Sequence, residues 1–402
     1  MKLNLGFYNQ CLGISFSLIF LLFGCNQTLD KESVDVSVGQ NCVQDFNQDT
    51  DYFPEKVAPD FATGFTVDYR KNYKVVTVKQ PWEDTNQNLE YVFVQCGTPI
   101  PTEYPDATIV EIPVNRVIAM STTYLPHIEI LNQQETLVGV GDRRLIYSSK
   151  IRESIVSGAV QEVGDLQQDN EIVLGLQPDV IFSYRLENSE SGGLETLESL
   201  GLKIVLDAAH LEASPLGRAE WLKFTALLFN EEATANQEFV AIAQRYQKLK
   251  DLAQDIAEKP TVISGSPYQG TWYSPGGKSF FAQLFRDANV TYPWDETKSR
   301  LSLPLDFEVV LNKAKNANYW INVNPAWQTT NDAFSEDQRY ELLGAAIAGN
   351  IYAANARIAE DGGNDFWEGG VTNPDVVLAD LIKIFHPDLL PEHELFYYQQ
   401  LQ

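Results

Sequence analysis

The sequence is short of positive charge and of metal-binding side chains. It has 29 lysines and arginines against 55 aspartates and glutamates, and only four histidines in 402 residues. Such an acidic chain is a poor partner for nucleic acid, because phosphate binding needs a basic surface. The four histidines do not provide the cluster that a bare metal ion needs. We therefore predict no nucleic-acid partner, no metal site and no cofactor.

The motifs of common enzyme classes are also absent. There is no G-x-S-x-G, no P-loop, no G-x-G-x-x-G after a predicted strand and no C-x-x-C. Asp361 and Asp365 could form the acid-base pair of a glycoside hydrolase, which would also use the many aromatic residues. Aspartates in a glycine-rich loop more often form turns or bind cations. We predict a binding protein, with a glycoside hydrolase as the alternative.

A mostly apolar run stands near the N-terminus. Residues 12–23 are too few for a typical membrane span and are followed by Gly24 and Cys25. This pattern predicts a lipoprotein signal peptide in residues 1–24 and lipidation of Cys25, with an ordinary signal peptide as the alternative. Several acyl chains would anchor the protein stably, and the polar residues 25–50 would form a flexible tether. The predicted location is extracytoplasmic or periplasmic, on the cell membrane.

Two cysteines remain for the folded part. Cleavage would remove Cys11 and lipidate Cys25, which leaves Cys42 and Cys96. Outside the cytoplasm such a pair can form a disulfide, and two buried free thiols are the alternative.

The rest of the chain divides by its hydrophobic pattern. Residues 51–112 contain two segments of alternating apolar and polar residues, which predict a small antiparallel sheet as an accessory β element. Residues 113–217 and 259–402 alternate strand-like and helix-like segments, which predict two α/β lobes with parallel or mixed sheets. The fold class is therefore α/β, with two lobes and an N-terminal β extension.

A helical connector joins the two predicted lobes. Residues 218–258 contain no glycine or proline, and Asn230 followed by Glu231 and Glu232 resembles a helix cap. We expect the longer helix to run from about Glu231 to Ala257.

The residues that follow the predicted strands are candidates for a cleft between the lobes. Ligands of such sheets bind beyond the carboxyl ends of the strands. Arginine can bind the oxygens of an anionic ligand, and aromatic rings add contact area. Gly270 before Trp272 and Pro275 after it indicate a loop. The candidates are Thr122, Thr123, Tyr124, Arg143, Arg144, Tyr147 and Tyr184 in the first lobe, and Trp272, Tyr273, Trp327, Arg357 and Trp367 in the second.

Five segments in this order carry a family resemblance. They are NRVIAMS at 115–121, LVGVGD at 137–142, VGD at 163–165, LQPDVI at 176–181 and KPTVI at 259–263. With the lipoprotein signal and the long helix, the chain resembles the ABC-transporter substrate-binding proteins for iron-siderophore complexes and cobalamin, over roughly residues 114–390. The N-terminal β extension is not part of that common core.

The resemblance implies a receptor that delivers a captured metal chelate to an ABC permease and its ATPase. A ferric siderophore is the expected ligand; cobalamin, another solute and a transport-independent sensor are alternatives. In this family an acidic residue on each lobe pairs with the permease. By position these are Glu162 in the first lobe and either Asp287 or Glu296 in the second. We also expect the protein to be a monomer.

Overall fold

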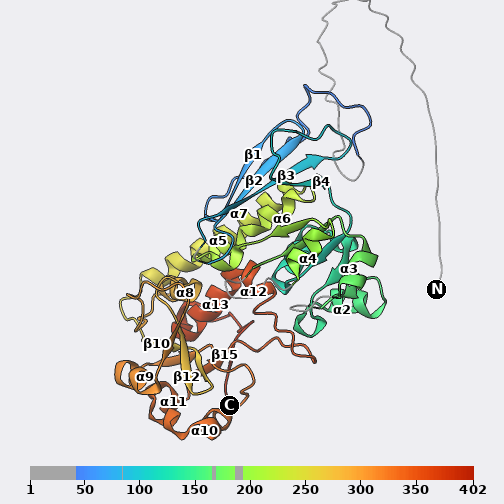
Figure 1. Cartoon of the computed structure of the whole chain (residues 1–402). Coiled ribbons are helices and arrows are strands. Elements are labelled where there is room, and N and C mark those ends of the chain that lie inside the picture. The colour runs from blue at the N-terminus through green and yellow to red at the C-terminus, as the bar shows by residue number, and fades with distance from the viewer. Residues whose placement is uncertain (1–41, 84, 165–168, 186–192) are drawn as a thin grey trace, which may run out of the picture. The chain divides into compact units, whose positions relative to one another are not determined.

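Four β-sheets organise the residues that the computed structural model describes, which are 42–83, 85–164, 169–185 and 193–402 (Figure 1). These residues belong to one compact unit. The predicted signal peptide and Cys25 lie outside the described residues. Within the described ranges, no helix has the length and apolar character needed to cross a membrane.

The N-terminal sheet forms from the accessory β element. Its strands, in spatial order, are β1 (Phe65–Tyr69), β2 (Tyr73–Lys79), β3 (Asn88–Gln95) and β4 (Thr108–Ile112). The first three pair antiparallel as predicted, whereas β4 pairs with β3 in parallel, which the alternation does not predict. A disulfide joins Cys42 to Cys96 directly after β3, so of the two alternatives the structure has the bridge.

The first lobe is built on a fully parallel sheet. Its order is β7-β6-β5-β8-β9, with β5 (Val117–Ala119), β6 (Leu137–Val140), β7 (Gln161–Glu162), β8 (Val180–Ser183) and β9 (Ile204–Leu206). The central strands are buried, as expected of parallel strands covered by helices. The helices of this lobe are α1 (Leu125–Ile130), α2 (Ser149–Val156), α3 (Asn170–Leu176) and α4 (Leu194–Ser199).

The connector consists of α5 (Pro215–Ala219), α6 (Trp221–Leu227) and the long α7 (Glu232–Gln254). The predicted cap is wrong, because Asn230 has a φ of 58° and precedes the N-cap residue Glu231. Its side chain instead accepts a hydrogen bond from Lys74 Nζ at 2.8 Å and donates one to Gln95 Oε1 at 2.8 Å. The residue that was expected to start the helix therefore ties the helix to the N-terminal sheet.

The second lobe contains two sheets. The order β10-β14-β15-β16 combines the parallel strands β10 (Val262–Ser264), β14 (Tyr319–Ile321) and β15 (Ile351–Ala353) with the antiparallel β16 (Gln399–Gln400). A smaller antiparallel sheet holds β11 (Ser266–Tyr268), β12 (Thr271–Pro275) and β13 (Ser302–Leu305). The helices are α8 (Phe280–Asp287), α9 (Phe307–Ala314), α10 (Thr330–Glu336), α11 (Gly344–Ile347), α12 (Gly369–Thr372) and α13 (Pro374–Phe385).

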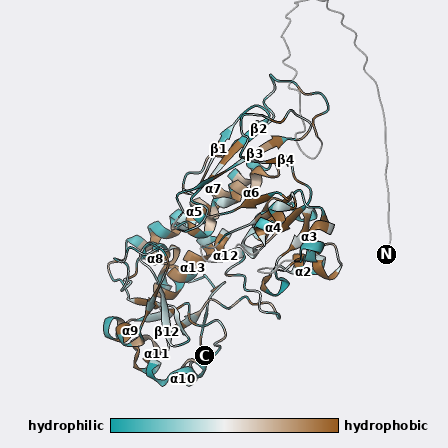
Figure 2. Cartoon of the chain, in the orientation of Figure 1, coloured by the Kyte–Doolittle hydropathy of each residue, from teal (hydrophilic) through white to brown (hydrophobic). Residues whose placement is uncertain are grey.

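The connector is packed on both sides. Helix α7 packs against α6 and against α13, whose residues are mostly hydrophobic (Figure 2). Helix α6 faces the N-terminal sheet, where the Phe65 ring lies 4.9 Å from the Trp221 ring and 5.5 Å from the Phe224 ring. The N-terminal sheet and the second lobe are thus both fixed to one helical segment.

Candidate functional site

The strand ends of the first lobe meet as predicted. Because β5, β6 and β8 are parallel, their carboxyl ends share one edge of the sheet. A cavity of about 70 Å³ lies there, lined among others by Thr122, Asp142 and Tyr184. This volume holds a few water molecules rather than a bulky solute.

A much larger cavity of about 990 Å³ lies beyond the last strand of this sheet. We call it the large cavity. Its wall combines Thr63, Gly64 and residues of the β2–β3 connection with residues after β9, such as His210 and Glu212, and residues around the start of α8, such as Lys278. The two cavities adjoin, since the Tyr184 and His210 rings meet edge to face at 6.1 Å. The volume is at the upper end of the range of small-molecule sites.

Four cationic side chains line the large cavity. They are Lys79, Arg218, Lys278 and Arg300, and none of them forms an ion pair with any described residue. Lys79, Lys278 and Arg300 are exposed at the wall, and Arg218 is half-buried. In a chain with a formal charge of −26, four unpaired cations around one cavity favour an anionic occupant.

Arg218 is held in place with part of its donor capacity unused. Its Nη2 donates to the carbonyl of His210 at 2.7 Å, and its guanidinium lies 4.5 Å from the centre of the Phe280 ring. Its Nε is buried and has no hydrogen-bond partner among the described residues. Burial lowers the pKa of Arg218 to about 10, which still leaves it charged at neutral pH. A buried N–H without a partner is costly, and the charge of this guanidinium still acts on the cavity that the side chain lines.

The acidic residues of the lining offset these cations only in part. Glu212 is buried, and its carboxylate accepts the N–H groups of Thr63 and Gly64 at 2.7 and 2.8 Å. Glu83 is the other carboxylate of the lining. Burial and the charge of Arg218 lower the pKa of His210 to about 4, so this imidazole is neutral at pH 7. The electrostatic balance of the wall is therefore positive.

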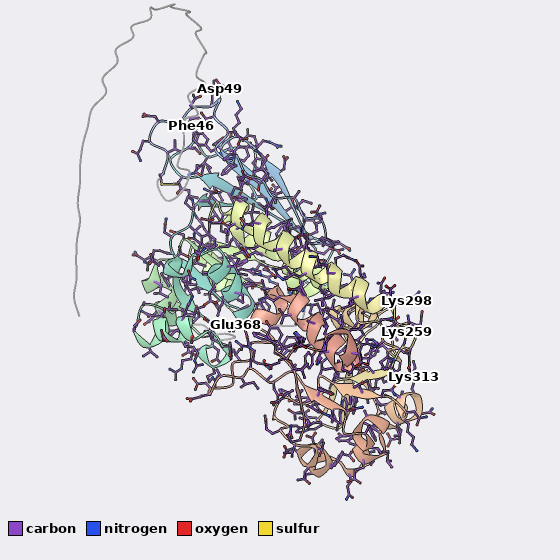
Figure 3. All side chains as sticks on the ribbon, turned by 180° about the vertical axis from the view of Figure 1, so that it is seen from behind. Phe46, Asp49, Lys259, Lys298, Lys313 and Glu368 are labelled. Atoms are coloured by element: carbon purple, nitrogen blue, oxygen red, sulfur yellow. A yellow bond between two sulfur atoms is a disulfide. The ribbon has the colours of Figure 1, made fainter. Side chains whose placement is uncertain are left out.

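The two lobes also contact each other directly, beside a further cavity of about 470 Å³ that Arg143, Arg152 and Asp361 line. The buried Glu368, directly before α12, accepts the N–H groups of Tyr147 at 2.7 Å and Ser148 at 2.9 Å. Figure 3 shows Glu368 where the C-terminal elements meet the first lobe. Burial raises the pKa of Glu368 to about 7. Nearby, Arg152 of α2 pairs with Asp361 at 2.9 Å.

The first-lobe candidates have different surroundings. Thr122 and Tyr184 line the small cavity, and Thr123 is half-buried beside it. Tyr124 is buried and its ring stacks on Phe182 at 4.0 Å, so it belongs to the core. The exposed Arg143 and Arg144 pair with Glu162 at 3.9 Å and Asp142 at 2.6 Å. The half-buried Tyr147 lies 5.0 Å from the Arg357 guanidinium.

Two second-lobe candidates are in the core, contrary to the expectation. The segment around Trp272 is strand β12 rather than a loop, and the alternation of a strand turns Trp272 inward and Tyr273 outward. Trp272 stacks on Trp320 at 5.2 Å, and Trp327 meets Trp320 at 5.6 Å, with both tryptophans buried.

The remaining second-lobe candidates lie at the surface or at the contact between the lobes. Tyr273 is 42% and Trp367 48% exposed, and neither lines the large cavity. Arg357 pairs with Asp365 at 2.6 Å and lies over the Phe396 ring at 4.2 Å. The guanidinium of Arg357 is thus engaged by side chains of the protein itself.

The two alternatives for permease contact in the second lobe differ in exposure. Asp287 is buried, where it accepts hydrogen bonds from Tyr246 Oη at 2.7 Å and pairs with Lys250 at 3.0 Å. Such a residue has no surface to offer. Glu296 is exposed, and Glu162 lies exposed on β7.

Both carboxylates of the glycoside-hydrolase alternative are engaged in ion pairs. Asp361 is bound to Arg152 and Asp365 to Arg357. In the described residues there is no group of three or more His, Cys, Asp and Glu side chains arranged to hold a metal ion.

Sequence reasoning missed most of the large cavity. Lys79, Trp82 and Glu83 stand in or beside a segment that reads only as a strand connection, and Arg218 opens the helical connector. Lys278 directly follows Gly276-Gly277 just before α8, so the sequence does show a cation in a turn there.

Comparison with known proteins gives one family. The model of the periplasmic binding protein family matches residues 117–358. A lipoprotein of Methanocaldococcus jannaschii is 28% identical over 290 residues, covering 70% of this chain and 67% of the relative.

Solved structures share the fold at low identity. A Staphylococcus epidermidis protein described as a possible iron-binding periplasmic solute-binding protein has a TM-score of 0.54 and 16% identity, covering 68% of this chain and 98% of its own. A protein of the ABC-type Fe³⁺-hydroxamate transport system of Saccharomonospora viridis has a TM-score of 0.52 and 14% identity, covering 68% and 94%.

Proposed function

The chain belongs to the periplasmic binding protein family, and from this premise we propose that it is an extracytoplasmic lipoprotein that captures an anionic metal chelate for an ABC importer. A ferric siderophore is the proposed ligand. The permease and its ATPase are the proposed partners. Glu162 of the first lobe and Glu296 of the second are the residues proposed to contact the permease. The lipid on Cys25 is the proposed anchor, and the lipoprotein relative supports it.

The observation that carries this proposal is the large cavity with its four unpaired cations. A chelate of ferric iron with carboxylate or catecholate groups is bulky and negatively charged, which matches a volume of about 990 Å³ and the positive wall. The titles of the S. epidermidis and S. viridis structures, which name iron and Fe³⁺-hydroxamate, support iron as the metal. Cobalamin is the second candidate, but a ligand without net negative charge does not account for the four cations of the cavity wall.

Binding of a small panel tests the proposal. The full chain carrying Cys25→Ser is titrated calorimetrically with ferric citrate, ferric enterobactin, ferrioxamine B and cyanocobalamin. The first two are anionic, ferrioxamine B is cationic and cyanocobalamin has no net charge. We expect one-to-one binding of an anionic chelate at micromolar concentration or below. Binding of cyanocobalamin alone would favour the second candidate, and no binding at all would contradict the proposal.

A further inference from the structure

The N-terminal sheet supplies part of the large cavity although it lies outside the family match. The match begins at residue 117, and β1–β4 end at Ile112. Thr63, Gly64, Lys79, Gln80, Trp82 and Glu83 nevertheless line the cavity together with residues of both lobes. We name residues 80–83 and 85–87 the Trp82 loop.

From this placement we propose that the Trp82 loop and Lys79 form a third wall of the solute site and select anionic chelates. The inference rests on the proposed function and adds the selectivity element. Three observations support it: the attachment of the N-terminal sheet, the attachment of the loop, and the cation Lys79 that this wall contributes.

Three buried carboxylates attach the N-terminal segment to the helical connector and to the turn just before it. Glu220 accepts the N–H groups of Asp60, Phe61 and Ala62 at 2.7–3.0 Å. Glu212 accepts those of Thr63 and Gly64. Glu232 pairs with Lys74 of β2 at 2.5 Å, with both side chains almost fully buried. A wall fixed in this way is preorganised for binding, which lowers the entropy lost when a ligand docks.

The Trp82 loop is itself joined to the first lobe. The Arg185 guanidinium, directly after β8, lies 4.8 Å from the centre of the Trp82 ring. The ring also packs against apolar residues of the first-lobe core. The loop therefore reaches from the N-terminal sheet to the first lobe and packs against it.

The third wall brings one cation, Lys79, and one carboxylate, Glu83, to the cavity. Lys79 is exposed to the cavity and has no ion-pair partner among the described residues. The other cations of the cavity wall are Arg218, Lys278 and Arg300. An anionic chelate would be contacted by cations from the N-terminal sheet, the connector and the second lobe, whereas a cationic chelate of similar size would be repelled by these cations.

Calorimetric titration of loop variants tests this inference. Lys79→Gln in the full chain with Cys25→Ser should bind ferric citrate or ferric enterobactin about two- to five-fold more weakly, and the loss should shrink at high salt. Trp82→Ala added to it should bring the loss to about tenfold. The control is Lys71→Gln, an exposed lysine in the turn between β1 and β2 that is absent from the cavity wall, which should bind as the parent does.

The outcomes separate the two proposals. A parent protein that binds the anionic chelates, with Lys79→Gln and the double variant binding equally well, would overturn the third wall and leave the proposed function standing. A parent protein that binds neither chelate would overturn both.

Discussion

Removing the Glu220 carboxylate should destabilise the protein strongly, because this group fixes the N-terminal segment. Glu220 is fully buried and accepts three backbone N–H groups together with Lys223 Nζ at 2.7 Å. Glu220→Ala removes the carboxylate that lies 2.7 Å from the buried Lys223 Nζ. The carboxylate of Asp60, at 4.0 Å, is then the remaining ion-pair partner of Lys223. Breaking a buried pair by removing one partner typically costs about 3–5 kcal/mol, and the unpaired N–H groups act in the same direction.

Urea unfolding followed by tryptophan fluorescence measures this loss. We expect the free energy of unfolding of Glu220→Ala to fall by about 3–5 kcal/mol, with a smaller fall for Glu220→Gln, which keeps an acceptor oxygen. The matched control is Asp60→Asn, because Asp60 faces the same lysine at 4.0 Å but is 77% exposed. It should change stability by less than about 0.5 kcal/mol. A loss below about 1 kcal/mol for Glu220→Ala would refute the claim that this carboxylate fixes the segment.

Three further predictions follow from other parts of the molecule. Burial raises the pKa of Glu368 to about 7, so its contribution to stability is fully present below its ordinary pKa of 4.5 and is lost as the pH rises through 7. Between pH 4.5 and 7, the free energy of unfolding of the wild type should fall by roughly 3 kcal/mol relative to that of Glu368→Gln, as measured by urea unfolding at a series of pH values. Parallel pH profiles of the two proteins would contradict this. Trp272→Ala should lower the free energy of unfolding by about 3–5 kcal/mol, because the ring lies in the hydrophobic core and not in a cleft. Thermal or urea unfolding measures this loss, and an unchanged midpoint would show that the ring is not a core residue. Cys25→Ser should move the protein from the membrane to the soluble fraction or block its maturation, and an unchanged membrane fraction on immunoblots would exclude lipidation there.

The spacing of apolar residues along the sequence was enough to predict the central strands of the first lobe and the long helix. The buried runs at 117–119, 137–140 and 180–183 became the central strands of the first lobe, and the long helix lies within three residues of its predicted ends. The spacing of apolar residues decides such elements, whatever they pack against.

The errors concern side chains whose environment comes from distant segments. Gly270 and Pro275 made the Trp272 segment resemble a loop, and only its pairing with β11 and β13 shows it to be a strand. Asp287 is buried because Tyr246 and Lys250 of α7 bind it. Nothing in the local sequence reveals either contact.

The large cavity was hidden for the same reason. Its walls come from segments around residues 80, 210 and 300. Each of these segments reads alone as an ordinary connection, so their chemistry appears only when the chain has folded.

Native mass spectrometry of the protein purified from iron-starved cells tests the central claim most directly. The account predicts one bound small molecule per chain whose mass includes iron and whose free form is anionic, with the bound fraction lower after growth in iron-rich medium. A bound sugar, peptide or metal-free neutral solute, or the same empty protein under both conditions, would contradict it.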